Sequence, residues 1–309
     1  MRQRNFTPQQ IGIGVTQETD MGGFASIGEC MIELSGNEGD QWRMGFAGDT
    51  LNTAWYMRAL TDKSYPVEYV TAFGEDSFSQ KQRVFLTSNG IGIAHSPVIG
   101  GLHPGLYAIT LDGAERSFTY WRSNAAARRL ACDRDALEKS LAGRDMIYFS
   151  GITLAIILPE HRATFFDILH QCRAAGSRIA FDPNFRQQLW PDRKAAREII
   201  SNAMGIADIA LPTFPDEQAL FGDRDAAACA KRIAALGVGG ECTLVPSAAA
   251  QAIDTTGAGD SFNGAYLAAR LNGLAPVEAA RKAHLVAARV VEIRGALAPM
   301  ETARATFAG

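Results

Sequence analysis

Short apolar runs alternate with longer segments of helical periodicity along most of the chain. The apolar runs, such as VEYV, MIYF and RIAF, are typical of buried strands, and helix-like segments separate them. This alternation predicts an α/β fold with a mainly parallel sheet and helices on both faces. The first strand is predicted over 24–34, although Gly28 and Glu29 interrupt it, and the last over 241–245.

The segment 105–122 has a different pattern, with two short β-like runs joined by an Asp-Gly pair. Such a pair between β-like runs is a strong hairpin signal. Alternation along the second run puts Phe118, Tyr120 and Arg122 on one face. A polar and aromatic hairpin inserted in an α/β chain predicts a lid over a site, not a part of the core.

The composition excludes several classes of protein. The 309 residues, 47% hydrophobic and 20% charged, suit a globular chain of one large or two small domains. A net charge of −3 gives no basic field for nucleic acid, and no apolar run approaches the ~18–20 residues of a membrane span. Five widely spaced cysteines without a C-x-x-C argue against disulfides or zinc and predict a cytoplasmic protein.

A glycine-rich turn precedes a helical pattern near the C-terminus. Apolar residues recur at helical spacing from Phe262 onward, so the preceding glycines lie at a helix N-terminus. Free backbone amides, the helix dipole and the close approach that glycine permits would together form an anion hole there. Asp260, at the same place, can accept a proton from a hydroxyl. An ordinary helix N-cap remains the alternative interpretation.

Two common nucleotide-binding motifs are missing from the sequence. Neither G-x-x-x-x-G-K-[ST] nor G-x-G-x-x-G occurs. Both a P-loop enzyme and a dinucleotide-binding dehydrogenase are therefore disfavoured.

Three motifs, taken in order, resemble those of ribokinase-like (PfkB-type) carbohydrate kinases. GFAGDTLNTAWYMRAL is similar to the sugar-binding motif, FDPNFR to the mid-chain motif and DTTGAGDSFNGAY to the C-terminal signature. The stretches IGECMIEL, TYWRSNAAAR and FDPNFRQQLW are most similar to 2-keto-3-deoxygluconate kinases. The resemblance implies a three-layer α/β/α sandwich with a small β-sheet lid. We expect one domain over 25–303, with lid strands around 31–48 and 102–124, after a disordered or cloning-derived extension at 1–24.

The resemblance also implies a reaction. The family transfers phosphate from ATP with Mg²⁺, and a monovalent cation is a further candidate cofactor. Asp260 corresponds to the catalytic base, and Gly257, Ala258, Gly259 and Asn184 to nucleotide-binding positions. The expected reaction is phosphorylation of the 6-hydroxyl of 2-keto-3-deoxygluconate. A kinase for a neutral sugar such as fructose or ribose, and an inactive sugar-binding homologue, remain alternatives.

Three residues near the start of the second motif match the family's sugar-binding positions: Gly48, Asp49 and Asn52. An aspartate accepts hydrogen bonds from two hydroxyls, an asparagine donates and accepts, and a glycine leaves room for the sugar. A plain helix cap is the alternative for Asp49.

A second group of residues suits an acidic substrate. Tyr107, Tyr120 and Arg122 match positions that contact the sugar acid in ketodeoxygluconate kinases, and an arginine fork binds a carboxylate with two hydrogen bonds. Arg186 ends the FDPNFR motif and either joins them or faces the phosphates. An exposed lid face or a dimer contact is the alternative for Tyr120 and Arg122. Since exposed lid edges often pair, a homo-oligomer is expected.

The chain departs from the family at two places. Thr213 and Asp216 stand where many relatives have N-x-x-E, so no metal ligand is assigned. Near Val245–Pro246 about 20 residues that form two strands beside the adenine in relatives are missing. Either the printed sequence closes up a disordered segment, or that segment is truly deleted.

Overall fold

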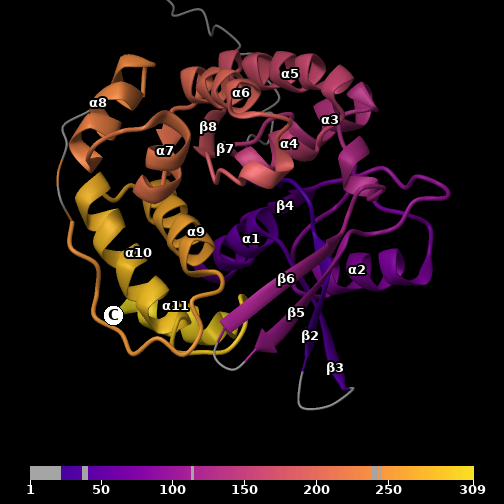
Figure 1. Ribbon diagram of the computed structural model, residues 1–309, viewed down its shortest axis with the longest axis horizontal. Coiled ribbons are helices and arrows are strands. Elements are labelled where there is room, and N and C mark those ends of the chain that lie inside the picture. The colour runs from indigo at the N-terminus through magenta and orange to yellow at the C-terminus, as the bar shows by residue number, and fades with distance from the viewer. Residues whose placement is uncertain (1–21, 37–40, 113–114, 239–242, 244) are drawn as a thin grey trace, which may run out of the picture.

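The protein consists of a central parallel sheet between two layers of helices, with a smaller sheet at one side (Figure 1). The computed structural model describes residues 22–36, 41–112, 115–238, 243 and 245–309. The predicted extension at 1–24 lies almost wholly outside this part. Within the described residues, the Gly22 amide already bonds to the Gly143 carbonyl, and Phe24 begins the first strand.

Among the described residues, the central sheet has five strands, all parallel, which confirms the predicted α/β class. In spatial order they are β4 (Val67–Val70), β1 (Phe24–Ile27), β7 (Met146–Ser150), β8 (Arg178–Asp182) and β9 (Ile209–Ala210). Alternate residues of one strand enter opposite cores: Ile147 and Phe149 face one helical layer, whereas Met146 and Tyr148 face the other. Helices therefore cover both faces, as apolar runs without polar alternation predict.

Each helical layer buries one side of the sheet. One core includes residues of α3 (Arg134–Leu141), α4 (Gly151–Ile156), α5 (Arg162–Ala174), α6 (Arg193–Ile206), α7 (Phe214–Phe221) and α8 (Ala226–Ala235). The other core includes residues of α1 (Asp49–Leu60), α2 (Ser77–Ser88), α9 (Ala258–Leu271), α10 (Pro276–Val290) and α11 (Met300–Ala308). Short 3-10 turns lie at Ala126–Arg129, Pro159–His161 and Gln187–Leu189. The predicted three-layer sandwich is thus confirmed.

The smaller sheet is the predicted lid. Its order is β3 (Trp42–Ala47), β2 (Met31–Gly36), β5 (Leu106–Asp112) and β6 (Glu115–Trp121). The hairpin β5–β6 is antiparallel, with Tyr107 opposite Tyr120, and its Asp-Gly turn lies partly outside the described residues. The prediction of one strand over 24–34 is wrong, because the chain leaves the central sheet after Ile27 and enters the lid at Met31. Glu29 lies at this junction.

Two further elements differ from expectation. Most of the strand predicted at 241–245 lies outside the described residues, and the described residues 245–257 contain no strand. The apolar run before Thr213 forms β9 of only two residues, at the edge of the central sheet. No helix within the described ranges is both long and apolar enough to cross a membrane.

Candidate active site

A cavity of about 1200 Å³ opens between the lid and the carboxyl ends of the central strands. Ligands of open α/β sheets bind at this edge, because the loops and helix N-termini that follow the strands meet there. All twelve residues predicted for the site line it: Gly48, Asp49, Asn52, Tyr107, Tyr120, Arg122, Asn184, Arg186, Gly257, Ala258, Gly259 and Asp260. The structure therefore brings together residues that lie up to 212 positions apart in the sequence.

The glycine turn begins α9 at the cavity wall. Gly257 is the N-cap, with φ of 77°, and a Cβ there would lie 2.8 Å from the Ala296 carbonyl oxygen. Only glycine fits this conformation and this close contact. At Gly259 a Cβ would meet no protein atom within 4 Å, so the space in front of that residue is open. The backbone amides of Gly259 and Asp260 have no acceptor within the described part of the chain, and they suit an anion.

Asp260 is the third residue of α9, so its carboxyl is not the N-cap and the ordinary capping interpretation is wrong. Asn52 donates a hydrogen bond from its Nδ2 to Asp260 Oδ2 over 2.7 Å. Burial, with the negative charge of Asp49 added, raises the pKa of Asp260 to about 7, although Asn52 and Arg186 oppose the rise. A carboxyl with that pKa can take up a proton near neutral pH, as a general base must.

Asp49 lies at the start of α1 but does not cap it. The N-cap is Gly48, which has no side chain to cap the helix, and a Cβ there would lie 2.2 Å from the Glu29 carbonyl oxygen. Asp49 Oδ2 instead accepts a hydrogen bond from Asn184 Nδ2 over 2.8 Å. Asn184 is the one non-glycine residue with positive φ in the described chain, a costly conformation that tends to occur at functional sites.

The lid supplies aromatic rings and an arginine. The rings of Tyr107 and Tyr120 lie 5.8 Å apart, and Tyr107 donates its hydroxyl hydrogen to Glu33. Arg122 follows β6 and forms an ion pair with Glu29; the two side chains are 11% and 1% exposed. An exposed lid face is therefore wrong for Arg122, whereas Tyr120 is 47% exposed.

The sequence-based prediction missed two carboxylates that line the cavity, Glu29 and Asp182. Asp182 ends β8 and accepts hydrogen bonds from the Asn184 amide and from Asn263 Nδ2. Burial, followed by the charges of two neighbouring aspartates, holds the pKa of Asp182 well above its usual range. Its place at the carboxyl end of a buried parallel strand was the signal that could have found it.

Arg186, Thr213 and Asp216 also line the cavity. Arg186 Nη1 lies 3.1 Å from Asp216 Oδ2, so the arginine is already paired with an acid. Hydroxyl and carboxylate oxygens suit Mg²⁺ and its water shell, so Thr213 and Asp216 fit a metal held through water.

Comparison with known proteins identifies the family. The model of pfkB family carbohydrate kinases matches residues 21–303. The chain belongs to this family. It is therefore a carbohydrate kinase, an enzyme that transfers a phosphoryl group to an alcohol.

The similarity to individual proteins extends over most of the chain. The 2-dehydro-3-deoxygluconokinase of Dickeya dadantii is 40% identical over 301 residues, which cover 90% of this chain and 97% of the relative. The enzyme of the same name from Escherichia coli K12 is 38% identical, with the same coverage. A solved structure from E. coli in complex with ATP and Mg²⁺ has a TM-score of 0.78 and 22% identity, and the match covers 93% of this chain and 99% of that one. At this identity the structure shows the shared fold.

The part of the kinase chain that aligns with these relatives is shorter than the alignment itself. The alignment with the Dickeya dadantii relative is 301 residues long and covers 90% of the 309 residues of this chain, which is about 278 residues. The aligned part of this chain is therefore about 23 residues shorter than the alignment. This shortfall has the size predicted for the missing segment near Val245–Pro246.

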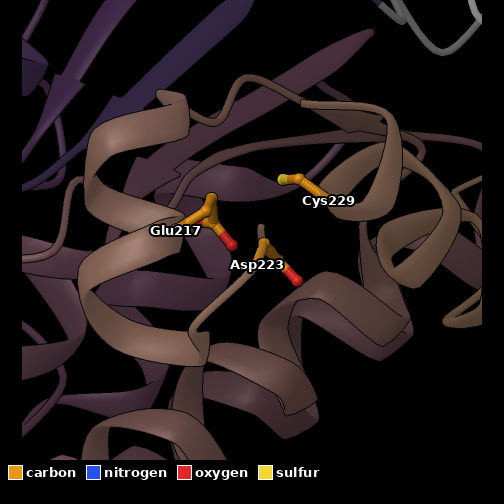
Figure 2. Close-up of side chains that lie close together, drawn as sticks. All are labelled: Glu217, Asp223 and Cys229. Atoms are coloured by element: carbon orange, nitrogen blue, oxygen red, sulfur yellow. The ribbon is translucent and has the colours of Figure 1, made fainter. Parts of the chain in front are cut away.

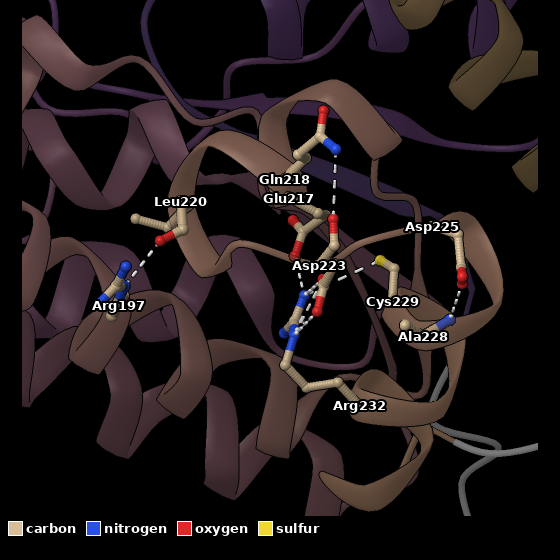
Figure 3. A network of polar contacts seen from close by, with 9 residues as sticks. All are labelled: Arg197, Glu217, Gln218, Leu220, Asp223, Asp225, Ala228, Cys229 and Arg232. Atoms are coloured by element: carbon tan, nitrogen blue, oxygen red, sulfur yellow. Dashed lines mark hydrogen bonds and ion pairs between the residues drawn. The ribbon is translucent and has the colours of Figure 1, made fainter.

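A second polar cluster lies outside the kinase cavity, between α7 and α8 (Figure 2). Glu217, Asp223 and Cys229 each offer one ligand atom, and these atoms lie within 4.8 Å of one another. Figure 3 shows that Arg232 reaches the same place, with Nη2 at 2.5 Å from Glu217 Oε2 and 2.7 Å from Asp223 Oδ2. Because the guanidinium pairs with both acids, the cluster is an ion-pair network between two helices.

Replacing Arg232 by methionine is expected to destabilise the fold by about 3–5 kcal/mol, since it leaves the fully buried Glu217 carboxylate without its partner. The loss should shrink at low pH, because burial raises the pKa of Glu217 and protonation removes the unpaired charge. Urea unfolding at two pH values measures both effects. Arg224→Met is the control, since Arg224 forms an exposed pair with Asp225. Equal unfolding midpoints for both variants would contradict this role of Arg232.

Proposed function

We propose that this kinase transfers the γ-phosphoryl group of ATP to the 6-hydroxyl of 2-keto-3-deoxygluconate. The observation that carries the proposal is the Arg122 guanidinium, buried in the cavity wall beneath the lid. A neutral sugar needs no such group, whereas a 2-keto acid presents a carboxylate that a guanidinium binds. Two relatives that are 38–40% identical over 90% of this chain are both named 2-dehydro-3-deoxygluconokinase, which supports the same substrate.

The geometry suggests how each group takes part. Asp260 accepts the proton of the 6-hydroxyl while that oxygen forms a bond to the γ-phosphorus. The bond between this phosphorus and the bridging oxygen breaks, and ADP leaves with the bonding electrons. The free amides of Gly259 and Asp260 donate to the phosphoryl oxygens, where negative charge accumulates. Asp49 and Asn52 are proposed to hold sugar hydroxyls, and lid closure would exclude water.

Mg²⁺ is the proposed metal cofactor, and it would neutralise phosphate charge during transfer. Thr213 and Asp216 are the residues proposed to organise its water shell. The E. coli structure that holds ATP and Mg²⁺ on the same fold supports this proposal. The role of Asn184 in nucleotide binding and the need for a monovalent cation are also proposals, since Asn184 here bonds to Asp49.

We further propose a cytoplasmic homo-oligomer without nucleic-acid or membrane partners. The use of ATP and the four described cysteines, all free thiols, support the location. Large apolar side chains exposed on the outer lid strands, Trp42, Met44 and Trp121, support association through the lid.

The proposed base gives a pH dependence. With both substrates saturating, kcat is expected to fall about tenfold per pH unit below about pH 7, because Asp260 becomes protonated there and cannot accept the hydroxyl proton. Above that pH the rate should reach a plateau. Asn52→Ala removes a hydrogen bond that favours the charged carboxylate, so the acidic limb should move to higher pH. A flat profile from about pH 5 to about pH 8 would contradict the assignment of the base.

A coupled assay of ADP release tests the substrate. The purified kinase is offered ketodeoxygluconate, gluconate, fructose and ribose with ATP and Mg²⁺. We expect the highest kcat/KM with ketodeoxygluconate. A higher value for fructose or ribose would establish a neutral-sugar kinase instead, and no turnover with any of them would favour an inactive sugar-binding homologue.

A further inference from the structure

Glu29 is a buried acid in the cavity wall to which the proposed reaction assigns no role. It lies at the junction of β1 and β2, and Gly105 at the start of β5 covers it so closely that a Cβ would lie 2.3 Å from Glu29 Oε1. One carboxylate oxygen accepts a hydrogen bond from Arg122 Nη2. The other, Oε1, is buried and has no hydrogen-bond partner among the described residues. A buried charged acceptor without a partner is costly, so this environment favours the neutral form of Glu29.

The charges of the cavity wall pose a difficulty for an acidic substrate. Among the described residues, five carboxylates line it, whereas the charged nitrogen groups of the lining are two guanidiniums, those of Arg122 and Arg186. Each guanidinium is already paired with an acid, Arg122 with Glu29 and Arg186 with Asp216. A substrate carboxylate that binds Arg122 would therefore share one positive charge with Glu29. Two buried negative charges beside one positive charge are strongly unfavourable.

We infer that Glu29 takes up one proton when a carboxylate substrate binds, which releases Arg122 from its ion pair to hold that substrate. This inference rests on the proposed acidic substrate. The bond that forms is an O–H bond at Glu29, with the proton drawn from solvent, and no other bond changes. The unpartnered Oε1 is then able to carry this hydrogen.

The surroundings of Glu29 favour such an exchange. Burial raises the pKa of Glu29, and the charge and hydrogen bond of Arg122 oppose that rise, so Arg122 is the main partner that favours the charged form. Asp49 of α1 adds a smaller effect that favours the neutral form, and Arg128 of the adjoining 3-10 turn adds one that opposes it. Burial raises the pKa of the neighbouring Cys30 thiol and Tyr69 hydroxyl, so both stay uncharged near neutral pH.

A substrate carboxylate that draws Arg122 away weakens the interaction that lowers the pKa of Glu29, so this pKa rises further on binding. At a pH between the pKa of Glu29 in the free kinase and its pKa in the complex, binding takes up as much as one proton. The affinity for the acid then falls with rising pH by up to about tenfold per pH unit. A neutral sugar leaves the ion pair intact and takes up no proton. Glu29 is thus a positioning residue that frees Arg122 for acids alone.

Calorimetry of 2-keto-3-deoxygluconate binding without ATP, in two buffers of different ionisation enthalpy, counts the protons taken up. In a series of measurements over the pH range in which the kinase stays folded, we expect uptake by the unmodified kinase and none by Glu29→Gln, whose affinity for the acid should vary less with pH. Glu33→Gln is the matched control, because it alters another acid of β2 and should keep the uptake. Asp260→Asn should also keep it, which excludes the catalytic acid as the source.

The outcomes separate this inference from the proposed function. Binding of the acid without proton uptake over that whole pH range, or uptake that persists in Glu29→Gln, overturns the role of Glu29 and leaves the kinase assignment intact. Loss of proton uptake in Asp260→Asn also overturns the role of Glu29. This outcome keeps the test decisive if Glu29→Gln does not fold. Absence of turnover with any sugar acid in the coupled assay overturns the proposed substrate, and with it this inference.

Discussion

Asp260→Asn is expected to lower kcat by about 10²–10⁴-fold while leaving the affinity for the sugar nearly unchanged. The amide keeps the size of the carboxyl and its place at the start of α9, but it cannot accept the hydroxyl proton as phosphoryl transfer begins. A coupled assay gives kcat, and calorimetry without ATP gives sugar affinity. The separation of the two measurements matters, because a residue that only shapes the cavity would weaken binding as well.

Asp167→Asn is the matched control for that variant. Asp167 belongs to α5, its side chain is 63% exposed, and it pairs with Arg134 at the surface. The same chemical change there should leave kcat unaltered. A kcat for Asp260→Asn within tenfold of the unmodified enzyme would remove Asp260 from the chemical step.

Arg122→Ala is expected to weaken binding of the acid substrate by about 2–5 kcal/mol, which is at least about 30-fold in Kd. The variant removes the guanidinium that the substrate carboxylate is proposed to contact. Affinity for fructose, which has no carboxylate, should change much less. Calorimetry with both sugars gives the comparison, and the difference between them is the quantity that counts.

Arg134→Ala is the control for the arginine variant, because its side chain is 42% exposed and lies on α3, where it pairs with surface acids. Arg122→Lys should lose less affinity for the acid than Arg122→Ala and more than Arg134→Ala, since lysine keeps the charge but not the planar fork. Equal losses for the acid and the neutral sugar in Arg122→Ala would mean that Arg122 supports the lid and does not read the carboxylate.

The local pattern of the sequence predicted those parts of the molecule that local physics determines. The continuous apolar run of β7 is buried on both faces, the helical spacing in α9 places apolar side chains in the core, and the glycine turn lies at the helix N-terminus as expected. The twelve site residues converge because strand ends and helix starts of an α/β sheet converge. Position at a helix N-terminus was enough to find the glycine turn and Asp260, whereas the sugar-binding positions came from the resemblance to the kinase family.

Partners that are distant in sequence were not predictable in this way. Asp49 looked like a helix cap, yet its carboxylate is held by Asn184, 135 residues later. Glu29 looked like an interruption within one strand, but the chain changes sheets there, and its partner Arg122 is 93 residues away. Such pairs depend on how the lid folds over the central sheet, which no short window of sequence encodes.

The loop between α10 and α11 connects the two halves of the cavity. Its Ala296 carbonyl lies against Gly257 of the glycine turn and also accepts a hydrogen bond from Tyr56 of α1 over 2.7 Å. Trp55, on the same helix, donates to the Ala298 carbonyl over 2.8 Å. A truncation that removed this loop would therefore loosen the sugar side and the phosphate side of the cavity together. A minimal catalytic fragment has to retain the chain through α11, and a fusion partner is better attached beyond that helix.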